Sequence, residues 1–163
     1  MSGRNLTIRP TTSDDGDYVA SIALEYFGST QVVSRERMHQ IETLSGFIAE
    51  SGNERVGLIQ FDVHNHELEV VTLVSRLQAA GVGRRLLEQT VDHARQQGNL
   101  SRCWLITTNN NHNAINFYRH VGWRLKATHY GAVNEARKLK PEIPLQDDRG
   151  IPIKDELEFE HLL

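Results

Sequence analysis

The sequence has little cysteine, few prolines before residue 141 and no long hydrophobic run. Its single cysteine, Cys103, excludes an intramolecular disulfide and any metal site built from several cysteines. No stretch approaches the roughly 18 consecutive apolar residues that a membrane-spanning helix needs, and the first ten residues lack the apolar segment of a secretory signal. We therefore expect a cytoplasmic protein that makes no membrane contact.

A surplus of positive charge is also missing. The chain has 18 Lys and Arg against 21 Asp and Glu, which gives a net charge of −3. Nucleic-acid-binding proteins usually carry a basic surplus, so we expect no nucleic-acid partner. Basic residues gather between positions 76 and 102, whereas 142–163 is acidic, and this distribution favours a local anion site over a polyanionic partner.

The hydrophobic pattern indicates one α/β domain over residues 1–163, a length that is sufficient to bury a core. The first half of the chain predicts a strand at 6–9, a helix ending at Gly28, and a second helix from about Ser34 with Met38, Ile41 and Leu44 inward. Three strands follow, at 46–50, 55–61 and 67–74. The remaining elements are a helix after Gly83 ending at Gly98, strand 103–107, helix 114–121 and strand 123–130. The three consecutive strands indicate an antiparallel meander, and the crossover over 67–107 implies parallel pairing, so the sheet is mixed.

The strand at 67–74 changes its hydrophobic parity. Leu68 and Val70 alternate, but Val71 and Leu73 continue on the other parity. Either a β-bulge, a feature often found beside active sites, or a strand buried on both faces explains this pattern.

The C-terminal segment differs from the rest of the chain. Three of the four prolines fall at or after residue 141. We expect a proline-punctuated extension over 131–163 that is irregular until a last strand at 157–163 on the sheet edge. Asp155 and Glu156 would favour a cationic substrate if they face a binding site.

A glycine-containing turn separates the strand at 67–74 from the following helix. The segment 78–83 reads Q-A-A-G-V-G, and Arg84 and Arg85 follow it. Glycines let a ligand approach the backbone closely, and the N–H groups and dipole at a helix N-terminus favour an anion. The turn suits a pyrophosphate cradle, although a G-x-G turn alone is also typical of an ordinary strand–helix connection.

A second motif begins at Asn111 and runs through Phe117 and Tyr118 to Trp123. A tyrosine on a short helix that faces the cradle suits a proton donor. The alternative is that Phe117 and Tyr118 only pack the helix onto the sheet.

Together the two motifs, Q-x-x-G-x-G and N-x-x-A-x-x-F-Y-x-x-x-G-W, resemble the GNAT superfamily of acyl-CoA-dependent N-acetyltransferases over about residues 6–130. The resemblance implies a single-domain GNAT-like α/β fold, with a β-bulge in the strand that contacts the coenzyme. It also implies transfer of an acetyl group from acetyl-CoA to a primary amine that attacks the thioester directly. The family commonly has a proline before the cradle, and here the linker is S-R-L at 75–77.

The resemblance also implies roles for individual residues. Leu73 and Val74 would pair with the pantetheine and polarise the thioester carbonyl, Asn111 would contact the coenzyme arm, and Tyr118 would protonate the leaving thiolate. Backbone N–H groups of the cradle would hold the pyrophosphate, and they belong to Gln78, Ala79, Ala80, Gly81, Val82, Gly83 and Arg84.

The general base is less clearly indicated. Glu69 lies on the strand that often carries the base in this family, and Glu67 shares its parity. Each is also typical of an exposed strand carboxylate, and a chain of water molecules is a further route for the proton.

Other functions and partners remain open in the sequence. A non-catalytic acyl-CoA sensor of the same fold, or a phosphate-binding interaction protein, would share parts of the pattern. The acceptor would be a small-molecule or peptide amine, and a homodimer is compatible with the family. We expect no metal, because His64, His66, His112 and His120 lack completing ligands at the usual spacing.

Overall fold

The computed structural model describes residues 5–77 and 80–163 of the chain. Its helices are α1 (Gly16–Phe27), α2 (Val82–Gln97), α3 (His112–His120) and α4 (Ala132–Leu139), with short 3₁₀ turns at Ser13–Asp15 and Ile41–Thr43. Its strands are β1 (Leu6–Pro10), β2 (Gln31–Ser34), β3 (Arg37–Gln40), β4 (Ser45–Ser51), β5 (Glu54–His64), β6 (Glu67–Ser75), β7 (Arg102–Thr108), β8 (Arg124–His129) and β9 (Glu156–Leu162).

The main sheet has the strand order β1-β4-β5-β6-β7-β9-β8. Strands β4, β5 and β6 form the predicted antiparallel meander, and β6 pairs in parallel with β7 after the α2 crossover. Both predictions are confirmed. The sequence indicates these connections because the G-N and N-H turns and the amphipathic stripe of α2 are local signals. No helix among the described residues has the length and hydrophobicity needed to cross a membrane.

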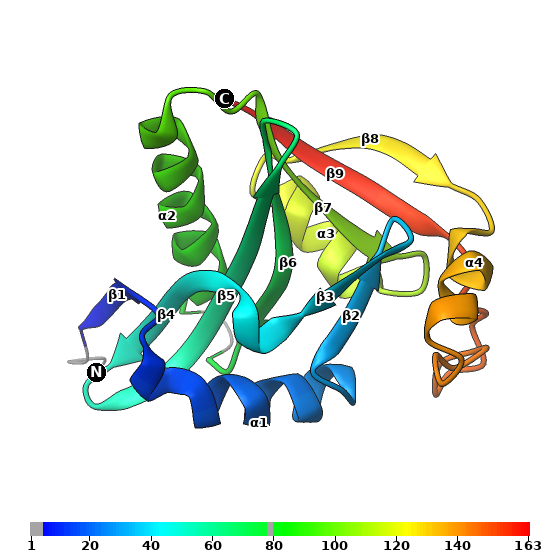
Figure 1. Cartoon of the computed structure of the whole chain (residues 1–163), viewed down its shortest axis with the longest axis horizontal. Coiled ribbons are helices and arrows are strands. Elements are labelled where there is room, and N and C mark those ends of the chain that lie inside the picture. The colour runs from blue at the N-terminus through cyan, green and yellow to red at the C-terminus, as the bar shows by residue number, and fades with distance from the viewer. Residues whose placement is uncertain (1–4, 78–79) are drawn as a thin grey trace.

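Helices cover both faces of the sheet (Figure 1). On one face α2 buries Leu86, Leu87 and Val91 against a core that includes Leu105 of β7 and Phe159 of β9. On the opposite face α1 packs against residues of β4, β5 and β6, together with the β2–β3 hairpin. This smaller core consists of Val19, Ile22, Ala23, Ile41, Ile48, Leu58 and Val74.

The parity change in β6 is a β-bulge. Gln60 of β5 pairs with Thr72, and the next residue, Phe61, pairs with Val70, so Val71 is the extra residue. A bulge bends the strand and increases its twist. The prediction from the hydrophobic pattern and the family resemblance is therefore confirmed.

The helix predicted from about Ser34 is wrong. Residues 31–40 form a two-stranded hairpin, in which Arg35 and Glu36 adopt positive φ values of 49° and 63° in the turn. A two-residue turn of this handedness matches the twist of paired strands, and the β-branched Val32 and Val33 favour a strand. Met38 and Ile41 are three positions apart, as on one face of a helix. In the structure Met38 lies in β3 and Ile41 lies in the 3₁₀ turn that follows it.

The expectation for the C-terminal strand is also wrong in one respect. β9 lies inside the sheet, between β7 and β8, and β8 is the edge strand. The acidic residues of β9 suggest an edge, but they alternate with Leu157 and Phe159, which face the core. Ion pairs with neighbouring arginines compensate for the burial of the acidic face. Helix α4, in the segment before the prolines, was not predicted.

Candidate functional site

The bulge of β6 is followed by a separation of two central strands. β6 and β7 pair only over residues 68–70 of β6 and 103–105 of β7, and then diverge (Figure 1). Beyond the bulge, β6 continues to pair with β5 as far as Ser75. Within the described residues, the β7-facing edge of 71–75 is thus left without a strand partner, and its backbone groups can pair with an extended ligand.

A pocket of about 500 Å³ lies on the α2 side of this separation. It brings together residues from the two motifs that are about thirty positions apart in the sequence. The lining residues are Leu73, Ser75, Leu77, Gly81, Val82, Gly83, Arg84, Asn113, Ala114, Phe117, Tyr118, His120 and Val121.

The N-terminus of α2 opens into this pocket. Gly81 is the N-cap residue, with a φ of +72°, and nothing lies within 4 Å of the position its Cβ would take. At Gly83, a Cβ would come 3.1 Å from the Phe117 ring, so α3 packs closely against this turn. The first N–H groups of a helix have no intrahelical acceptor and favour an anion. This backbone fits a diphosphate.

The remaining predicted cradle residues differ in how far the structure describes them. Gln78 and Ala79 lie outside the described residues, whereas Ala80 is exposed beside the turn. Arg84 lines the pocket and adds a positive charge to it. The part of the cradle that the structure describes is therefore the helix end itself.

Tyr118 lies on α3 and lines the same pocket. Its ring contacts three aromatic rings, with centroid distances of 5.5 Å to Phe117, 5.6 Å to Phe159 and 6.5 Å to Trp123. Burial raises the pKa of Tyr118 to about 12. The phenol therefore stays protonated at neutral pH and can donate a hydrogen bond or a proton to an anion that forms beside it.

Asn111 and Val74, two further predicted coenzyme contacts, are not among the residues that line this pocket. Asn111 is the N-cap of α3, and its side chain accepts a hydrogen bond of 3.3 Å from the N–H of Ala114. The side chain of Val74 is buried in the core under α1. Asn111 thus fixes where α3 begins, and its contact with the coenzyme arm stays a prediction. At Val74 the backbone, and not the buried side chain, is placed to pair with a ligand.

A second pocket, of about 250 Å³, approaches the bulge from the opposite face, between the hairpin and the strands. Its walls are mostly apolar, with two carboxylates and three hydroxyl groups among them. The lining residues are Phe27, Val32, Val33, Ser34, Glu69, Val70, Val71, Ile106, Thr107, Thr108 and Glu156. The two pockets therefore reach β6 from its two faces, close to the bulge.

Glu69 is not an exposed strand carboxylate. Only 1% of its surface is exposed, and the Ser34 hydroxyl donates a hydrogen bond of 2.5 Å to its Oε2 atom. His39 Nε2 lies 3.2 Å from the other oxygen, and His39 Nδ1 lies 3.6 Å from Asp62 Oδ2. Neither Glu69 Oε1 nor His39 Nε2 has a hydrogen bond of good geometry to any described residue. Asp62 is half-buried, so this row of groups leads from the pocket toward solvent.

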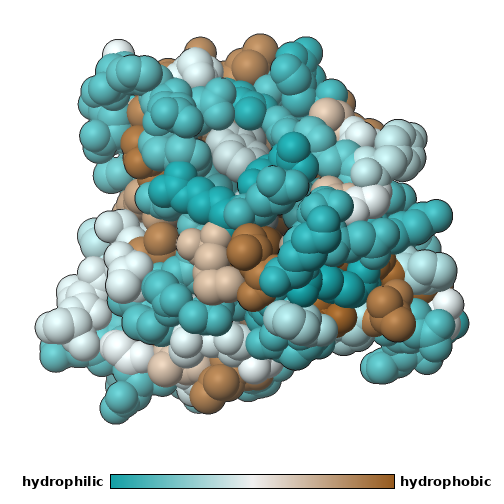
Figure 2. All heavy atoms as spheres, turned by 45° about the vertical axis from the view of Figure 1, so that its right-hand side comes forward, coloured by the Kyte–Doolittle hydropathy of each residue, from teal (hydrophilic) through white to brown (hydrophobic). Residues whose placement is uncertain are grey.

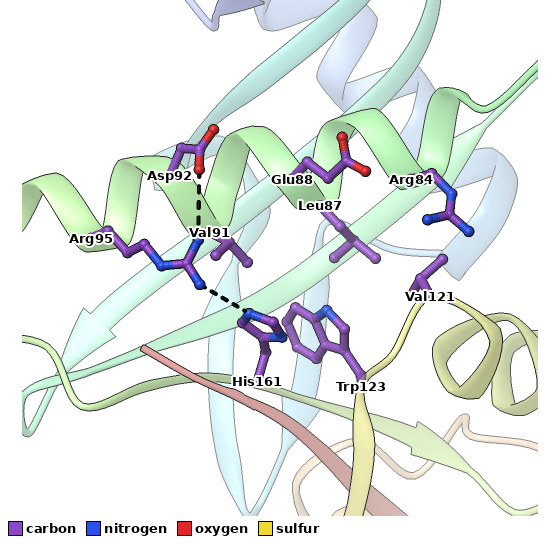
Figure 3. A pocket seen from close by; sticks show the side chains of 9 residues that line it. All are labelled: Arg84, Leu87, Glu88, Val91, Asp92, Arg95, Val121, Trp123 and His161. Carbon is purple, nitrogen blue, oxygen red and sulfur yellow. Dashed lines mark hydrogen bonds and ion pairs between the residues drawn. The ribbon is translucent and has the colours of Figure 1, made fainter.

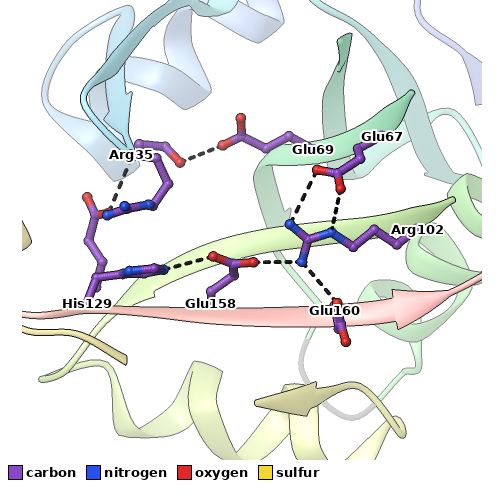
Figure 4. A network of polar contacts seen from close by, with 9 residues as sticks. Arg35, Glu67, Glu69, Arg102, His129, Glu158 and Glu160 are labelled. Carbon is purple, nitrogen blue, oxygen red and sulfur yellow. Dashed lines mark hydrogen bonds and ion pairs between the residues drawn. The ribbon is translucent and has the colours of Figure 1, made fainter. Parts of the chain in front are cut away.

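Beyond Glu69, a polar network extends across β6, β7 and β9 (Figure 4). Arg102 binds Glu67, Glu158 and Glu160, with shortest distances of 3.0, 2.6 and 3.0 Å. Glu67 forms an ion pair with Arg102 and does not line the pocket, whereas Glu69, the other carboxylate of β6, does.

Glu156 lies at the pocket end of this network. It accepts hydrogen bonds from the backbone N–H and the guanidinium of Arg35, at 3.3 and 3.4 Å. Burial raises its pKa above the ordinary range for a glutamate. The sequence signal for the network is the alternation of Glu156, Glu158 and Glu160 with apolar residues, which indicates that all three lie on one face.

A smaller pocket of about 200 Å³ runs along α2 toward the end of β9 (Figure 3). It shares Arg84 and Val121 with the larger pocket on this face. Arg95 pairs with Asp92 and contacts His161 there, and His161 lies over Trp123. This pocket extends the larger one between α2 and the side chains of Trp123 and His161.

Other reactive groups do not gather into a site. Among the described residues, no group of three or more His, Cys, Asp and Glu is arranged to hold a metal ion. Cys103 is buried in β7, and burial raises the pKa of its thiol to about 12, so little thiolate is present at neutral pH.

Comparisons with known proteins agree with this geometry. The profile of the Acetyltransferase (GNAT) family matches residues 16–123. The Bacillus subtilis protein YxbD is 37% identical over 153 residues, which cover 93% of this chain and 96% of YxbD. An IAA acetyltransferase from Bacillus cereus superposes with a TM-score of 0.72 at 17% identity, covering 98% and 100% of the two chains. A GNAT family acetyltransferase from Elizabethkingia anophelis, with acetyl-CoA bound, superposes at 0.68 and 18% identity, covering 98% and 99%.

Proposed function

The chain belongs to the acetyltransferase (GNAT) family, and from that premise we propose that it transfers an acetyl group from acetyl-CoA to a primary amine. One observation carries the proposal. Two pockets approach the bulge of β6 from opposite faces, and one ends in an anion-binding helix N-terminus while the other contains a buried carboxylate. A donor and an acceptor can therefore meet at the bulge without a covalent enzyme intermediate.

The larger pocket is proposed to bind acetyl-CoA. The N–H groups at the start of α2 and the Arg84 side chain hold the diphosphate, and the free edge of 71–75 pairs with the pantetheine. A backbone N–H at Leu73 or Val74 polarises the thioester carbonyl. The chemistry that acetyl-CoA supplies is an acyl group activated as a thioester.

Two side chains are proposed to move the protons. Glu69 removes the proton from the bound ammonium, and the free amine then attacks the carbonyl carbon. The N–C bond forms, the C–S bond breaks, and the thiolate takes the proton of the Tyr118 hydroxyl. The second proton that the nitrogen loses on becoming an amide restores this hydroxyl. Contact of Tyr118 with the pocket on the coenzyme side supports its role as the acid.

The proposed base also needs a way to release its proton, because Glu69 is buried. His39 lies 3.2 Å from Glu69 and 3.6 Å from Asp62, and Asp62 pairs with Arg37 near the surface. We propose that His39 carries the proton from Glu69 to Asp62.

The test of the function is binding of acetyl-CoA, followed by release of thiol in the presence of amines. We expect acetyl-CoA to raise the melting temperature by several degrees, ATP to leave it unchanged, and an amine to release coenzyme A as thiol. Binding without thiol release with any amine would indicate the acyl-CoA sensor instead. Absence of acetyl-CoA binding would overturn the assignment of the larger pocket.

The relay through His39 predicts the behaviour of His39→Gln. Glutamine can still contact Glu69 but cannot pass a proton on, so we expect kcat to fall by about tenfold to a hundredfold, with the KM for acetyl-CoA unchanged. Added imidazole should restore part of the rate. His64→Gln, at the end of β5 and outside both pockets, is the control and should keep the wild-type kcat. A loss that imidazole does not restore would leave His39 a structural role only.

A further inference from the structure

We infer that the acceptor is a cationic amine with an apolar alkyl or aryl body and no carboxylate, and that Glu156 selects it. The inference rests on the proposed function, and it concerns which amines the pocket of about 250 Å³ accepts. Three features support it: the surplus of carboxylates around the pocket, its apolar walls, and the lack of Lys, Arg and His among the described residues that line it.

The charge around the pocket is unbalanced toward the negative. The network across β6, β7, β8, β9 and the hairpin holds five carboxylates, those of Glu67, Glu69, Glu156, Glu158 and Glu160, against three guanidiniums, those of Arg35, Arg102 and Arg124. The Asp62–Arg37 pair next to His39 adds one charge of each sign. Among the described residues, the only further basic side chains that contact these five carboxylates are the imidazoles of His39 and His129. Buried carboxylates without counter-ions are costly, and a cationic ligand would offset that cost.

Neither of the two carboxylates that line the pocket has an ion pair with Arg102 or Arg124 among the described residues. Arg102 and Arg124 hold Glu160. Glu156, by contrast, has only the half-exposed Arg35 as an arginine partner, and Glu69 has Ser34 and His39. An ammonium placed between Glu69 and Glu156 would therefore lie beside two buried acceptors, next to the bulge where the thioester is attacked.

The walls of the pocket favour an apolar body. Besides Glu69 and Glu156, hydrocarbon side chains at the pocket come from Phe27, Val32, Val33, Val71 and Ile106, whereas the Val70 side chain belongs to the core under α2. None of the described residues that line it is Lys, Arg or His. A substrate carboxylate would thus be unpaired beside two buried carboxylates, and like charges at such distances oppose binding strongly. We therefore expect the pocket to bind an amine and to reject the corresponding amino acid, which differs from that amine by its carboxylate.

The surface around the acceptor side is compatible with a small charged ligand. Figure 2 shows the molecule turned so that the α4 side comes forward, and hydrophilic side chains dominate this view. Hydrophobic side chains appear there only in small patches between them. This face therefore presents no broad apolar area on which a large partner would dock.

Two matched series of amines test the inference. The aryl series is 2-phenylethylamine, L-phenylalaninamide and L-phenylalanine, and the alkyl series is 3-methylbutylamine, L-leucinamide and L-leucine. In each series the amide and the acid have nearly the same size but differ in the charge of one group. We expect kcat/KM for the amine and the amide to exceed that for the acid by about a hundredfold or more in at least one series.

Glu156→Gln isolates the residue that selects. Glutamine keeps an oxygen for Arg35 but removes the negative charge, so we expect the preference for amide over acid to fall by about tenfold or more. The KM for acetyl-CoA should not change. Glu67→Gln is the matched control, because Glu67 binds Arg102 in the same network without lining the pocket, and it should keep the wild-type preference.

Each outcome separates the inference from the proposed function. Acetyl-CoA binding with equal turnover of the acids and the amides would overturn the inference and leave the acetyltransferase standing. Acetyl-CoA binding without turnover of any of the six compounds would also overturn it. Failure to bind acetyl-CoA would overturn the proposed function itself. If Glu156→Gln does not fold, the preference of the wild-type protein still decides whether the acceptor lacks a carboxylate.

Discussion

Replacement of Gly81 by glutamate is expected to abolish acetyl-CoA binding. Gly81 caps α2 in open space at the mouth of the larger pocket. A glutamate there would place a carboxylate where the helix N-terminus is proposed to hold a diphosphate. Repulsion between like charges at close range costs several kcal/mol, so the affinity should fall by at least about a hundredfold. Isothermal titration calorimetry with acetyl-CoA measures this directly.

Gly98→Glu is the matched control for this prediction. Gly98 ends the same helix, has a positive φ of 80°, and also has open space at its Cβ position. Both substitutions therefore impose a similar backbone strain, about 1 kcal/mol, but only the one at Gly81 affects the N-terminus of α2. Equal acetyl-CoA affinity in the two variants would show that the turn at 80–83 is an ordinary strand–helix connection.

The sequence predicts the centre of this fold well because the signals there are local. The stripe of Leu86, Leu87 and Val91 specifies the buried face of α2, and glycines at both ends limit it. The parity change at Val71 is compatible with a bulge, because an extra residue in a strand moves every later side chain to the other face, and the family resemblance favours the bulge over a strand buried on both faces. These features need no knowledge of distant contacts.

The errors lie where distant contacts decide the structure. The hairpin at 31–40 depends on positive φ values at Arg35 and Glu36, residue types that do not by themselves indicate such a turn. The internal position of β9 depends on Arg102, more than fifty residues earlier, which forms ion pairs with Glu158 and Glu160. Neither the propensity of a residue nor its spacing reveals a partner of this kind.

The candidate site divides in the same way. The residues on the coenzyme side form two contiguous motifs, so the sequence indicates Gly81, Gly83 and Tyr118 together. The acceptor side is assembled from α1, the hairpin, β6, β7 and β9, and a motif cannot describe it. Glu69 is indicated only by its strand, and its contact with His39 depends on the hairpin at 31–40, where the sequence pattern predicts a helix.

Tyr118→Phe should lower kcat by about a hundredfold to ten-thousandfold, since the leaving thiolate then lacks its proton donor. Acetyl-CoA affinity should stay nearly the same, because phenylalanine keeps the ring contacts with Phe117, Trp123 and Phe159. Tyr130→Phe is the control, because Tyr130 is 84% exposed, and it should have the wild-type kcat.

The pH dependence distinguishes an acid from a packing residue. A folded-state pKa of about 12 means that Tyr118 remains protonated, and so able to donate, at every lower pH. The ratio of wild-type to variant kcat should therefore be constant between about pH 6 and 9, where histidine, but not this phenol, titrates. A ratio that falls toward one as the pH rises through this range would mean that Tyr118 loses its proton there. A ratio near one at every pH would mean that the thiolate leaves without this acid, and Tyr118 would then serve only to hold α3 against the sheet.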